Sequence, residues 1–344
     1  AAAAPCPPPA PPPRPAGPTS RLPLMTVASG LDQPDDLLFH GGELLVGLLG
    51  SGTVAVLRLG LASSRLPFHL ASLEGMAYVG STLYVAGQAG DVVDAVTPSG
   101  LRAVVRLRPV AGQEGVDGIG SQAGLLVVPD SPRGTVLWVD PATGRVVRSL
   151  AGFVRPTGVW TAPGGSLLVA DEFGDSAYEV GRDGSRRPLV SGLPVVDDIA
   201  QDAGGDVFAV TPAAGGGRLV RISGGVAADV ADGLAAPQGL ALDGAGNLFV
   251  TESGKGRVDL AVRTFELIPL RTDGAAGPAC LGLVRGPRFT APVRLAASAG
   301  LRILAQPGTG TVGRVLVTGC RPSPCTVTAT SGALTETLWV GGGP

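Results

Sequence analysis

The sequence predicts an all-β chain: a six-bladed β-propeller closed by an N-terminal strand, followed by a small C-terminal β-sandwich-like domain. Three observations predict it. A unit of four short strands recurs about every 40 residues, which is typical of propeller blades. The 54 glycines and 31 prolines among 344 residues suit many tight turns between short strands. The repeat stops near residue 264, although strand-like alternation continues beyond it.

Residues 1–21 come before the repeat and are predicted to form an extended tail. Nine of the first 20 residues are proline. This composition favours polyproline II and cannot form a packed core. We interpret the tail as a semi-rigid spacer; a docking strand for a partner is the alternative.

The repeat itself spans residues 22–263. Each unit has a small turn, an apolar strand, a turn rich in Gly or Asp, a second apolar strand and a third, and most units add a fourth. The six units begin with the stretches 29–47, 70–87, 115–130, 152–171, 191–210 and 232–252. The last unit lacks a clear fourth strand, whereas the stretch LPLMTVASG at 22–30 has the pattern of a fourth strand. We therefore expect the N-terminal strand to close the ring, which protects the edge strands.

Residues 264–344 no longer follow the repeat. Seven candidate strands alternate with turn residues there, a pattern that fits a small β-sandwich. This segment is therefore predicted to be a separate C-terminal domain that aids attachment or assembly.

Composition narrows the class of function. The net charge of −2 does not favour a nucleic-acid binder, and no apolar stretch is long enough to span a bilayer. The chain starts with AAAA rather than Met, as after signal cleavage at small residues. We expect an extracytoplasmic protein, whether periplasmic, cell-surface or secreted. A protein or cell-surface partner is expected, reached through the tail or the C-terminal domain.

The four cysteines are predicted to form disulfides. They show no CxxC motif and no Cys/His cluster, so zinc and haem sites are not indicated. An even number in an exported chain favours disulfides. Cys320 and Cys325 could close a hairpin turn, which would leave Cys6 with Cys280, although three pairings are possible. A lipid-modified or intermolecular Cys6 is the other interpretation.

One position of the repeat carries most of the acidic chemistry. The residues at this position are separated by 39, 43, 40, 40 and 41 residues, and they are Asp35, Glu74, Asp117, Thr157, Asp197 and Gln238. If the six first strands surround one axis, this column converges on it. Four carboxylates so placed must take up protons, be separated by solvent or share a cation.

Oxygen ligands of this kind suit Ca²⁺ or Mg²⁺. The sequence therefore predicts a metal site at the channel mouth, formed by Asp35, Glu74, Asp117 and Asp197. Four further residues are predicted to line the mouth: Thr157, Gln238, Asp36 and Asp198. Solvated carboxylates around a wide, water-filled mouth are the alternative.

The phrases PQGLALDGAGNLFVTESGKGRV and RPTGVWTAPGGSLLVADEFGD resemble the NHL repeat. They are also similar to the six-bladed propellers of the gluconolactonase and senescence-marker-protein superfamily. In its lactonase-like members this resemblance implies a divalent cation, often calcium, at one channel mouth. The residue just before the Gly of each first strand supplies the ligands. In this chain the pairs read Asp35-Asp36, Glu74-Gly75, Asp117-Gly118, Thr157-Gly158, Asp197-Asp198 and Gln238-Gly239, without the Asn that the family commonly uses.

No set of nucleophile and base is visible in the sequence. The two histidines, His40 and His69, stand in different parts of the first repeat and its linker, and no GxSxG, P-loop or dinucleotide motif has the right context. His40 is expected at an exposed turn and His69 on an outer strand or linking loop. The first hypothesis is a rigid binding or scaffold module for a protein, cell-surface or small-molecule partner.

The alternative is a Ca²⁺-dependent lactonase or hydrolase, in which the metal polarises the substrate carbonyl. In that hypothesis Asp117 or Asp197 serves as ligand or base. A carbohydrate-binding module ranks last, because only 4% of the residues are aromatic.

Overall fold

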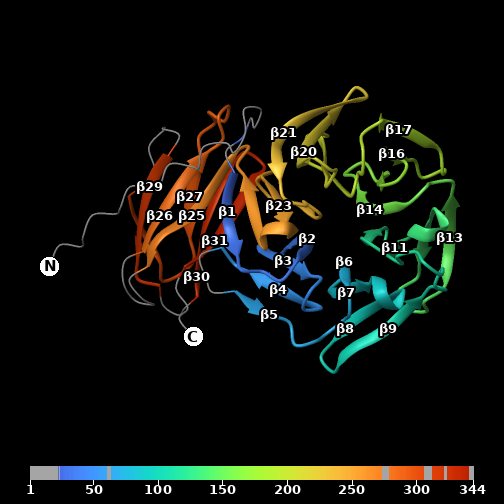
Figure 1. The fold of residues 1–344 in the computed structure, drawn as a ribbon. Helices are drawn as coiled ribbons and strands as arrows, with labels where there is room; N and C mark the ends of the chain where they lie inside the picture. Colours follow the sequence, from blue (N-terminus) through green and yellow to red (C-terminus); the bar gives the residue numbers. More distant parts are fainter. Residues whose placement is uncertain are drawn as a thin grey trace.

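The computed structural model describes residues 22, 24–59, 63–272, 279–305, 312–320 and 324–340. Six four-stranded sheets follow one another around a ring, and two further sheets, orange to red, stand beside it (Figure 1). Three single-turn 3-10 helices, η1 (Gln88–Gly90), η2 (Ser131–Arg133) and η3 (Ser253–Lys255), lie in loops of the ring. Within the described part, no helix is long and apolar enough to cross a membrane.

We number the sheets of the ring as blades 1 to 6 in chain order. Blade 1 contains β2 (Pro34–His40), β3 (Glu43–Leu48), β4 (Thr53–Leu57) and β5 (Ser64–Arg65). Blade 2 contains β6 (Leu73–Val79), β7 (Thr82–Gly87), β8 (Val92–Thr97) and β9 (Gly100–Arg106). Blade 3 contains β10 (Gly120–Gln122), β11 (Leu125–Asp130), β12 (Thr135–Val139) and β13 (Val146–Ala151).

The second half of the ring repeats this order of strands. Blade 4 contains β14 (Pro156–Thr161), β15 (Leu167–Asp171), β16 (Ser176–Val180) and β17 (Arg186–Ser191). Blade 5 contains β18 (Asp198–Gln201), β19 (Val207–Thr211), β20 (Gly217–Ser223) and β21 (Val226–Leu234). Blade 6 contains β22 (Leu240–Leu242), β23 (Leu248–Glu252), β24 (Arg257–Ala261) and β1 (Leu24–Ser29).

The fourth strand of blade 6 comes from the other end of the repeat region. β1 pairs antiparallel with β24, with Leu24 opposite Ala261. The Thr26 hydroxyl adds a hydrogen bond to the Asp259 carboxylate (2.7 Å). Segments more than 230 residues apart in the chain therefore share one sheet.

The second strands are apolar on both faces because each blade packs between two neighbours. In β3, Leu44 and Val46 belong to a cluster with Phe249 of blade 6, whereas Leu45 belongs to one with Leu73 of blade 2. Successive side chains of a strand point to opposite faces, so one short strand fills both clusters. A sheet covered on both faces needs such continuous apolar runs.

Glycines let the first strands of neighbouring blades approach closely. A Cβ atom at Gly75 would lie 2.6 Å from the Asp117 carbonyl oxygen, and one at Gly239 would lie 2.2 Å from the Asp35 carbonyl oxygen. No side chain fits in that space. The spacing around the axis therefore explains why glycine follows the column residue in four of the six blades.

The two further sheets contain the rest of the described chain. One has the strand order β25 (Phe265–Thr272), β26 (Ala279–Arg285), β29 (Val312–Thr318) and β28 (Arg302–Ala305). The other has the order β27 (Arg294–Ala297), β30 (Cys325–Ser331) and β31 (Leu334–Val340). Side chains of both sheets share one apolar core, which includes Phe265, Leu283, Val327 and Leu338.

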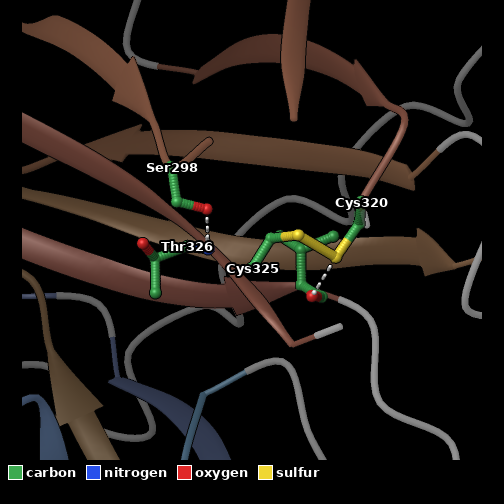
Figure 2. Close-up of a disulfide and its surroundings, with 5 residues drawn as sticks. Ser298, Cys320, Cys325 and Thr326 are labelled. Atoms are coloured by element: carbon green, nitrogen blue, oxygen red, sulfur yellow. Dashed lines mark hydrogen bonds between the residues drawn. A yellow bond between two sulfur atoms is a disulfide. The ribbon is translucent and has the colours of Figure 1, made fainter. Parts of the chain in front are cut away.

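A disulfide joins these two sheets and confirms one predicted pairing. Cys320, just after β29, is bonded to Cys325 at the start of β30 (Figure 2). Beside it, the Thr326 backbone N–H donates to Ser298 Oγ (3.0 Å). Cys280 of β26 is buried and disulfide-bonded. The predicted Cys6–Cys280 pairing remains a prediction, because Cys6 and the rest of the 1–21 tail lie outside the described residues.

A buried polar cluster connects the ring to the two further sheets. Asp243 lies in the β22–β23 turn, Glu266 on β25 and Glu336 on β31, and all three are buried. Asn247 Nδ2 donates to Asp243 Oδ2 (2.9 Å) and Glu266 Oε2 (3.0 Å), and the Leu267 backbone N–H donates to Glu336 Oε2 (3.2 Å). Glu266 Oε1 is buried without a hydrogen-bond donor. We call Asp243, Glu266 and Glu336 the junction triad.

Burial raises the pKa of every carboxyl group in the junction triad, and repulsion between the groups adds to the rise at Glu266 and Glu336. Burial raises the pKa of Glu336 to about 8, and burial together with Glu336 and Asp243 raises that of Glu266 well above its ordinary value. The pKa of Asp243 is also raised, chiefly by burial. Adjacent carboxyl groups share a hydrogen bond only when one of them carries a proton. The triad therefore holds protons in the folded protein at neutral pH.

Candidate functional site

The first strands of all six blades line one cavity of about 310 Å³ on the ring axis. This axial cavity collects seven of the eight residues predicted from the acidic column: Asp35, Asp36, Glu74, Asp117, Asp197, Asp198 and Gln238. Thr157 is the exception. Its side chain is fully buried, and its hydroxyl donates to the Asp197 carbonyl oxygen (2.7 Å), so it holds two blades together.

The carboxylates of Asp36 and Asp198 accept hydrogen bonds from backbone N–H groups, and each has one donor in the next blade. Asp198 accepts from its neighbour Ile199 (2.7 Å) and from Leu240 of blade 6 (2.8 Å). Asp36 accepts from Leu37 and from Met76 of blade 2 in the same way. Burial raises the pKa of Asp198 to about 7, opposed by its two N–H donors. These two carboxylates therefore have a structural role at the edge of the cavity.

Asp117 has an arginine partner that the sequence did not indicate. Arg155, only 5% exposed, donates from Nη2 to Asp117 (3.2 Å) and from Nε to Glu172 (2.7 Å). Its Nη2 also lies 3.3 Å from a carboxylate oxygen of Glu114. Burial raises the pKa of Asp117, and Arg155 opposes the rise, so that the value is about 6. The positive charge of the buried Arg155 guanidinium thus offsets part of the negative charge of the cavity, on the side of Asp117.

Three carboxyl groups of the column remain without such a partner. Among the described residues, no arginine or lysine forms an ion pair with Asp35, Glu74 or Asp197. Burial and the neighbouring carboxylates Asp117 and Asp35 raise the pKa of Glu74 to about 10. The pKa values of Asp35 and Asp197 are also raised well above the ordinary range, for the same reasons. These groups retain protons until a cation stabilises their charged forms.

Aromatic side chains line the other end of the axial cavity. His40 at the end of β2 stacks on Tyr78 near the end of β6, with ring centroids 3.8 Å apart. Both line the cavity, together with Trp160 of β14. His40 is exposed, as expected for its turn, yet it also faces the axis. The two-residue period of a strand is the signal that leads from Asp36 to His40 and from Glu74 to Tyr78.

His69 lies away from this site. Its Nδ1 is 3.0 Å from the Ser51 carbonyl oxygen in blade 1, and it does not line the axial cavity. Among the lining residues, His40 is thus the histidine that belongs to the site, and its stacking partner is an aromatic ring and not a nucleophile.

The predicted metal site of Asp35, Glu74, Asp117 and Asp197 stays a prediction. In the part of the chain that the structure describes, no three His, Cys, Asp or Glu side chains are grouped so that they could hold a metal ion. The reason is visible in the contacts: backbone N–H groups occupy Asp36 and Asp198, and Arg155 occupies Asp117. The remaining carboxyl groups give the cavity an acidic character without a fixed set of ligands.

The ring and its axial site define the class of fold, that of six-bladed β-propellers. The chain is similar to virginiamycin B lyase from Staphylococcus aureus (10% identity, TM-score 0.54), over 70% of this chain and 99% of that one. It is also similar to a gluconolactonase from Xanthomonas campestris (18%, 0.55), over 75% of this chain and 98% of that one. A luciferin-regenerating enzyme is similar as well (12% identity, TM-score 0.56), over 69% of this chain and 94% of that one.

These likenesses bear out the resemblance read from the sequence at the level of the fold. The sequence matches no family model and no curated protein. At such low identities the shared fold says nothing about activity, because one fold serves many functions. The function has to be argued from the axial cavity and the surface of this chain.

Proposed function

We propose that this protein is a rigid extracytoplasmic binding module, whose axial cavity receives the positively charged group of a small molecule or of a partner protein. In this proposal the pairing of β1 with β24 closes the ring, and the two further sheets form a β-sandwich-like domain that serves attachment. The tail of residues 1–21 is a spacer in the same proposal.

The observation that carries the proposal is the imbalance of charge in the axial cavity. Asp35, Glu74 and Asp197 line one cavity, and the buried guanidinium of Arg155 is already engaged by Asp117 and Glu172. Charges interact strongly where little water separates them. A cationic group that entered the cavity would displace protons from these carboxyl groups and take their place.

The aromatic end of the cavity supports the same class of ligand. Tyr78 and Trp160 offer ring surfaces on which an organic cation can rest, and the stacked His40–Tyr78 pair provides a flat wall. Binding sites commonly combine such apolar walls with a few polar groups that fix orientation. An amine with a short apolar chain therefore matches the cavity better than a bare ion does.

Calorimetric titration tests the proposal with three probes: putrescine, Ca²⁺ and Mg²⁺. We expect heat with putrescine at pH 7–8, and loss of about tenfold or more in affinity in Asp35→Asn and Glu74→Gln. Asp232→Asn, on the outer strand β21, is the matched control and should bind as the parent does. Heat that is absent for all three probes, or unchanged in the cavity variants, would show that the cavity is not a cation site.

A second candidate function is a Ca²⁺-dependent lactonase. The observation that favours it is the gluconolactonase fold, combined with carboxylates at the column where the resemblance places the metal ligands. Because the described side chains are not grouped as a metal centre, we derive no reaction step through calcium. A screen of lactones with and without Ca²⁺ decides the matter. Hydrolysis that disappears in Glu74→Gln and Asp197→Asn supports this candidate, and hydrolysis that survives both assigns the activity elsewhere.

A further inference from the structure

The outer strands of blades 2, 3 and 4 are rich in arginine, and the short outer strand β5 of blade 1 adds the exposed Arg65. β9, β13 and β17 follow one another around the outside of the ring (Figure 1). Their sequences GLRAVVR, VVRSLA and RRPLVS contain arginine and no acidic residue. The outer strand of blade 5, VAADVADGL, has two aspartates and no basic residue. The outer strands of blades 1 to 4 are thus basic, whereas those of blades 5 and 6 are acidic or uncharged, in a chain whose net charge is −2.

Six arginines from these strands and the adjoining turns form what we call the arginine band: Arg102, Arg106, Arg145, Arg148, Arg182 and Arg186. Five of them are exposed, and Arg148 is half-buried. Neighbouring blades are in contact at the strands and turns that contain these arginines. A Cβ at Gly144, next to Arg145, would lie 2.3 Å from the Val104 carbonyl oxygen, between Arg102 and Arg106 on β9.

Two hydrogen bonds connect the arginines of blade 3 with those of blade 4. Arg148 Nη1 donates to the carbonyl oxygen of Arg182 (3.2 Å), and Arg186 Nη1 donates to the carbonyl oxygen of Gly152. The strands and turns that carry these arginines therefore form one continuous strip across three blades. Such a strip of one sign creates a local field even when the whole protein is nearly neutral.

Two members of the band are held in place by aromatic rings. The Arg148 guanidinium lies over Trp138 (4.2 Å to the ring centroid), and that of Arg186 lies over Phe153 (4.9 Å) and Tyr178 (5.5 Å). Stacking of this kind fixes the plane of a guanidinium without neutralising its charge. It leaves N–H groups available for carboxylate or sulfate oxygens, which arginine binds in pairs.

Four acidic residues lie near the band: Asp94 interacts with Arg106, Glu179 pairs with Arg187, and Asp140 and Asp183 are engaged in their own turns. Asp140 accepts hydrogen bonds from the Ala142 backbone N–H and the Thr143 hydroxyl. Asp183 accepts from the backbone N–H and hydroxyl of Ser185. These bonds lower the pKa of both aspartates, and Arg145 and Arg148 contribute to the same effect. The four carboxylates reduce the field of the band, but the six guanidinium groups of the band together with that of Arg187 outnumber them.

We propose that the arginine band binds a linear anionic polysaccharide through its carboxylate or sulfate groups. A chain of regularly spaced charges can contact arginines on three blades at once, whereas a small anion reaches one or two. This surface is separate from the acidic axial cavity and does not depend on the function proposed for it. It identifies a cell-surface polymer as the kind of partner that the rim fits.

Two other polyanions fit the band less well. Single-stranded nucleic acids bind by stacking bases on exposed aromatic rings. Of the aromatic residues beneath the arginines, Trp138 and Phe153 are buried and Tyr178 is half-buried, with Arg186 over its ring. A membrane surface requires apolar anchors, commonly Trp, Phe or Leu. The band offers only the exposed Val146 and Val147 among the large apolar side chains of its described strands.

The test measures binding of fluorescently labelled heparin to the full chain by anisotropy, at several NaCl concentrations. The band variant is Arg102→Ser/Arg106→Ser/Arg145→Ser, whose three side chains are exposed. The control is Arg288→Ser/Arg294→Ser/Arg302→Ser, which removes the same charge from exposed sites outside the ring. We expect the band variant to lose about tenfold or more in affinity and to depend less on salt, since fewer counterions are released. The control should stay within about threefold.

Three results would overturn the proposal. One is no binding of heparin by the parent protein at 50 mM NaCl. Another is an equal loss in both triple variants, which would reduce the effect to net charge alone. The third is tighter binding of phosphatidylglycerol vesicles or of a DNA 20-mer than of heparin with the same dependence on the band. Circular dichroism of all variants checks that each has kept its fold.

Discussion

The carboxylate of Asp198 in blade 5 accepts a hydrogen bond from the backbone N–H of Leu240, which begins the first strand of blade 6 (2.8 Å). Asp36 of blade 1 is bonded to Met76 of blade 2 in the same way. At the other four joints a glycine brings the two backbones together directly. At these two joints the second aspartate of a pair links the blades through its carboxylate, and this relationship explains the paired aspartates at 35–36 and 197–198.

Asp198→Ala is expected to lower the free energy of unfolding by about 2 kcal/mol. The substitution leaves the buried N–H of Leu240 without its acceptor and removes a charge-assisted hydrogen bond. Urea denaturation monitored by tryptophan fluorescence measures the change. The control Asp232→Ala, on the outer strand of the same blade, should change the value by less than about 0.5 kcal/mol. Equal midpoints for the two variants would contradict a structural role for Asp198.

Arg155→Met is expected to destabilise the fold by about 3 kcal/mol, because it leaves the half-buried Asp117 and Glu172 without their buried counter-charge. Chemical denaturation at pH 7 measures the loss. The comparison is Arg133→Met, which removes a more exposed partner from Asp130 and should cost at most about 1 kcal/mol. Adding Glu172→Gln to Arg155→Met should recover part of the stability. A still lower free energy of unfolding in the double variant would show that the broken ion pair is not the cause of the loss.

Stability is expected to fall as the pH rises from about 4.5 to about 8, because the junction triad and the axial cavity both contain carboxyl groups with raised pKa values. The folded state raises the pKa of Glu336 to about 8 and also raises those of Glu266 and Asp243, so it binds protons that the unfolded chain has released. That contribution is complete below the unfolded pKa and disappears as the pH passes the folded value. Thermal melts across this range measure the slope.

The variant Glu336→Gln should flatten this slope and raise the stability at pH 8. The glutamine amide can donate to Glu266 Oε1, which has no donor in the described structure, and its carbonyl can still accept from the Leu267 N–H. We expect a gain of about 1–3 kcal/mol at pH 8, since each displaced pKa unit is worth about 1.4 kcal/mol. Asp232→Asn serves as the control. A slope unchanged by Glu336→Gln would place the titration in other groups.

Removal of the Cys320–Cys325 disulfide by the double change to serine should destabilise the two sheets outside the ring by about 2 kcal/mol. The estimate follows from the entropy of a short closed loop, in which the cysteines stand five residues apart. Hydrogen exchange measures the effect locally. Exchange should quicken in β30 and β31 and stay unchanged in β3 and β7 of the ring. Uniform quickening would show that ring and sheets unfold together.

The fold could be predicted from the sequence because one pattern is repeated. Each blade needs the same turns and the same apolar second strand, so six weak signals at a fixed spacing support one another. The acidic column followed from the same spacing, and the axial cavity does bring Asp35, Glu74, Asp117 and Asp197 together. Thr157 shows the limit of the argument. It occupies the same position of the repeat, but its side chain is buried against the next blade and does not line the cavity.

The balance of charge could not be read from the repeat. Arg155 stands 38 residues from Asp117 and meets it only because neighbouring blades pack side by side. The junction triad likewise brings together Asp243, Glu266 and Glu336 from a ring turn and two other sheets. Partners of this kind depend on packing between blades and sheets, and a pattern along the chain carries no information about them. The stacking of His40 on Tyr78 belongs to the same group.

The pairing of β1 with β24 has a consequence for how the protein is made. The strand Leu24–Ser29 leaves the ribosome long before its partner Arg257–Ala261, and at common rates of translation the delay is roughly ten to fifty seconds. During that interval the nascent chain carries an uncharged strand, LMTVAS, with no partner to pair with. Biosynthesis therefore requires that this segment be shielded, by a chaperone or by delayed folding, until the last blade has been translated.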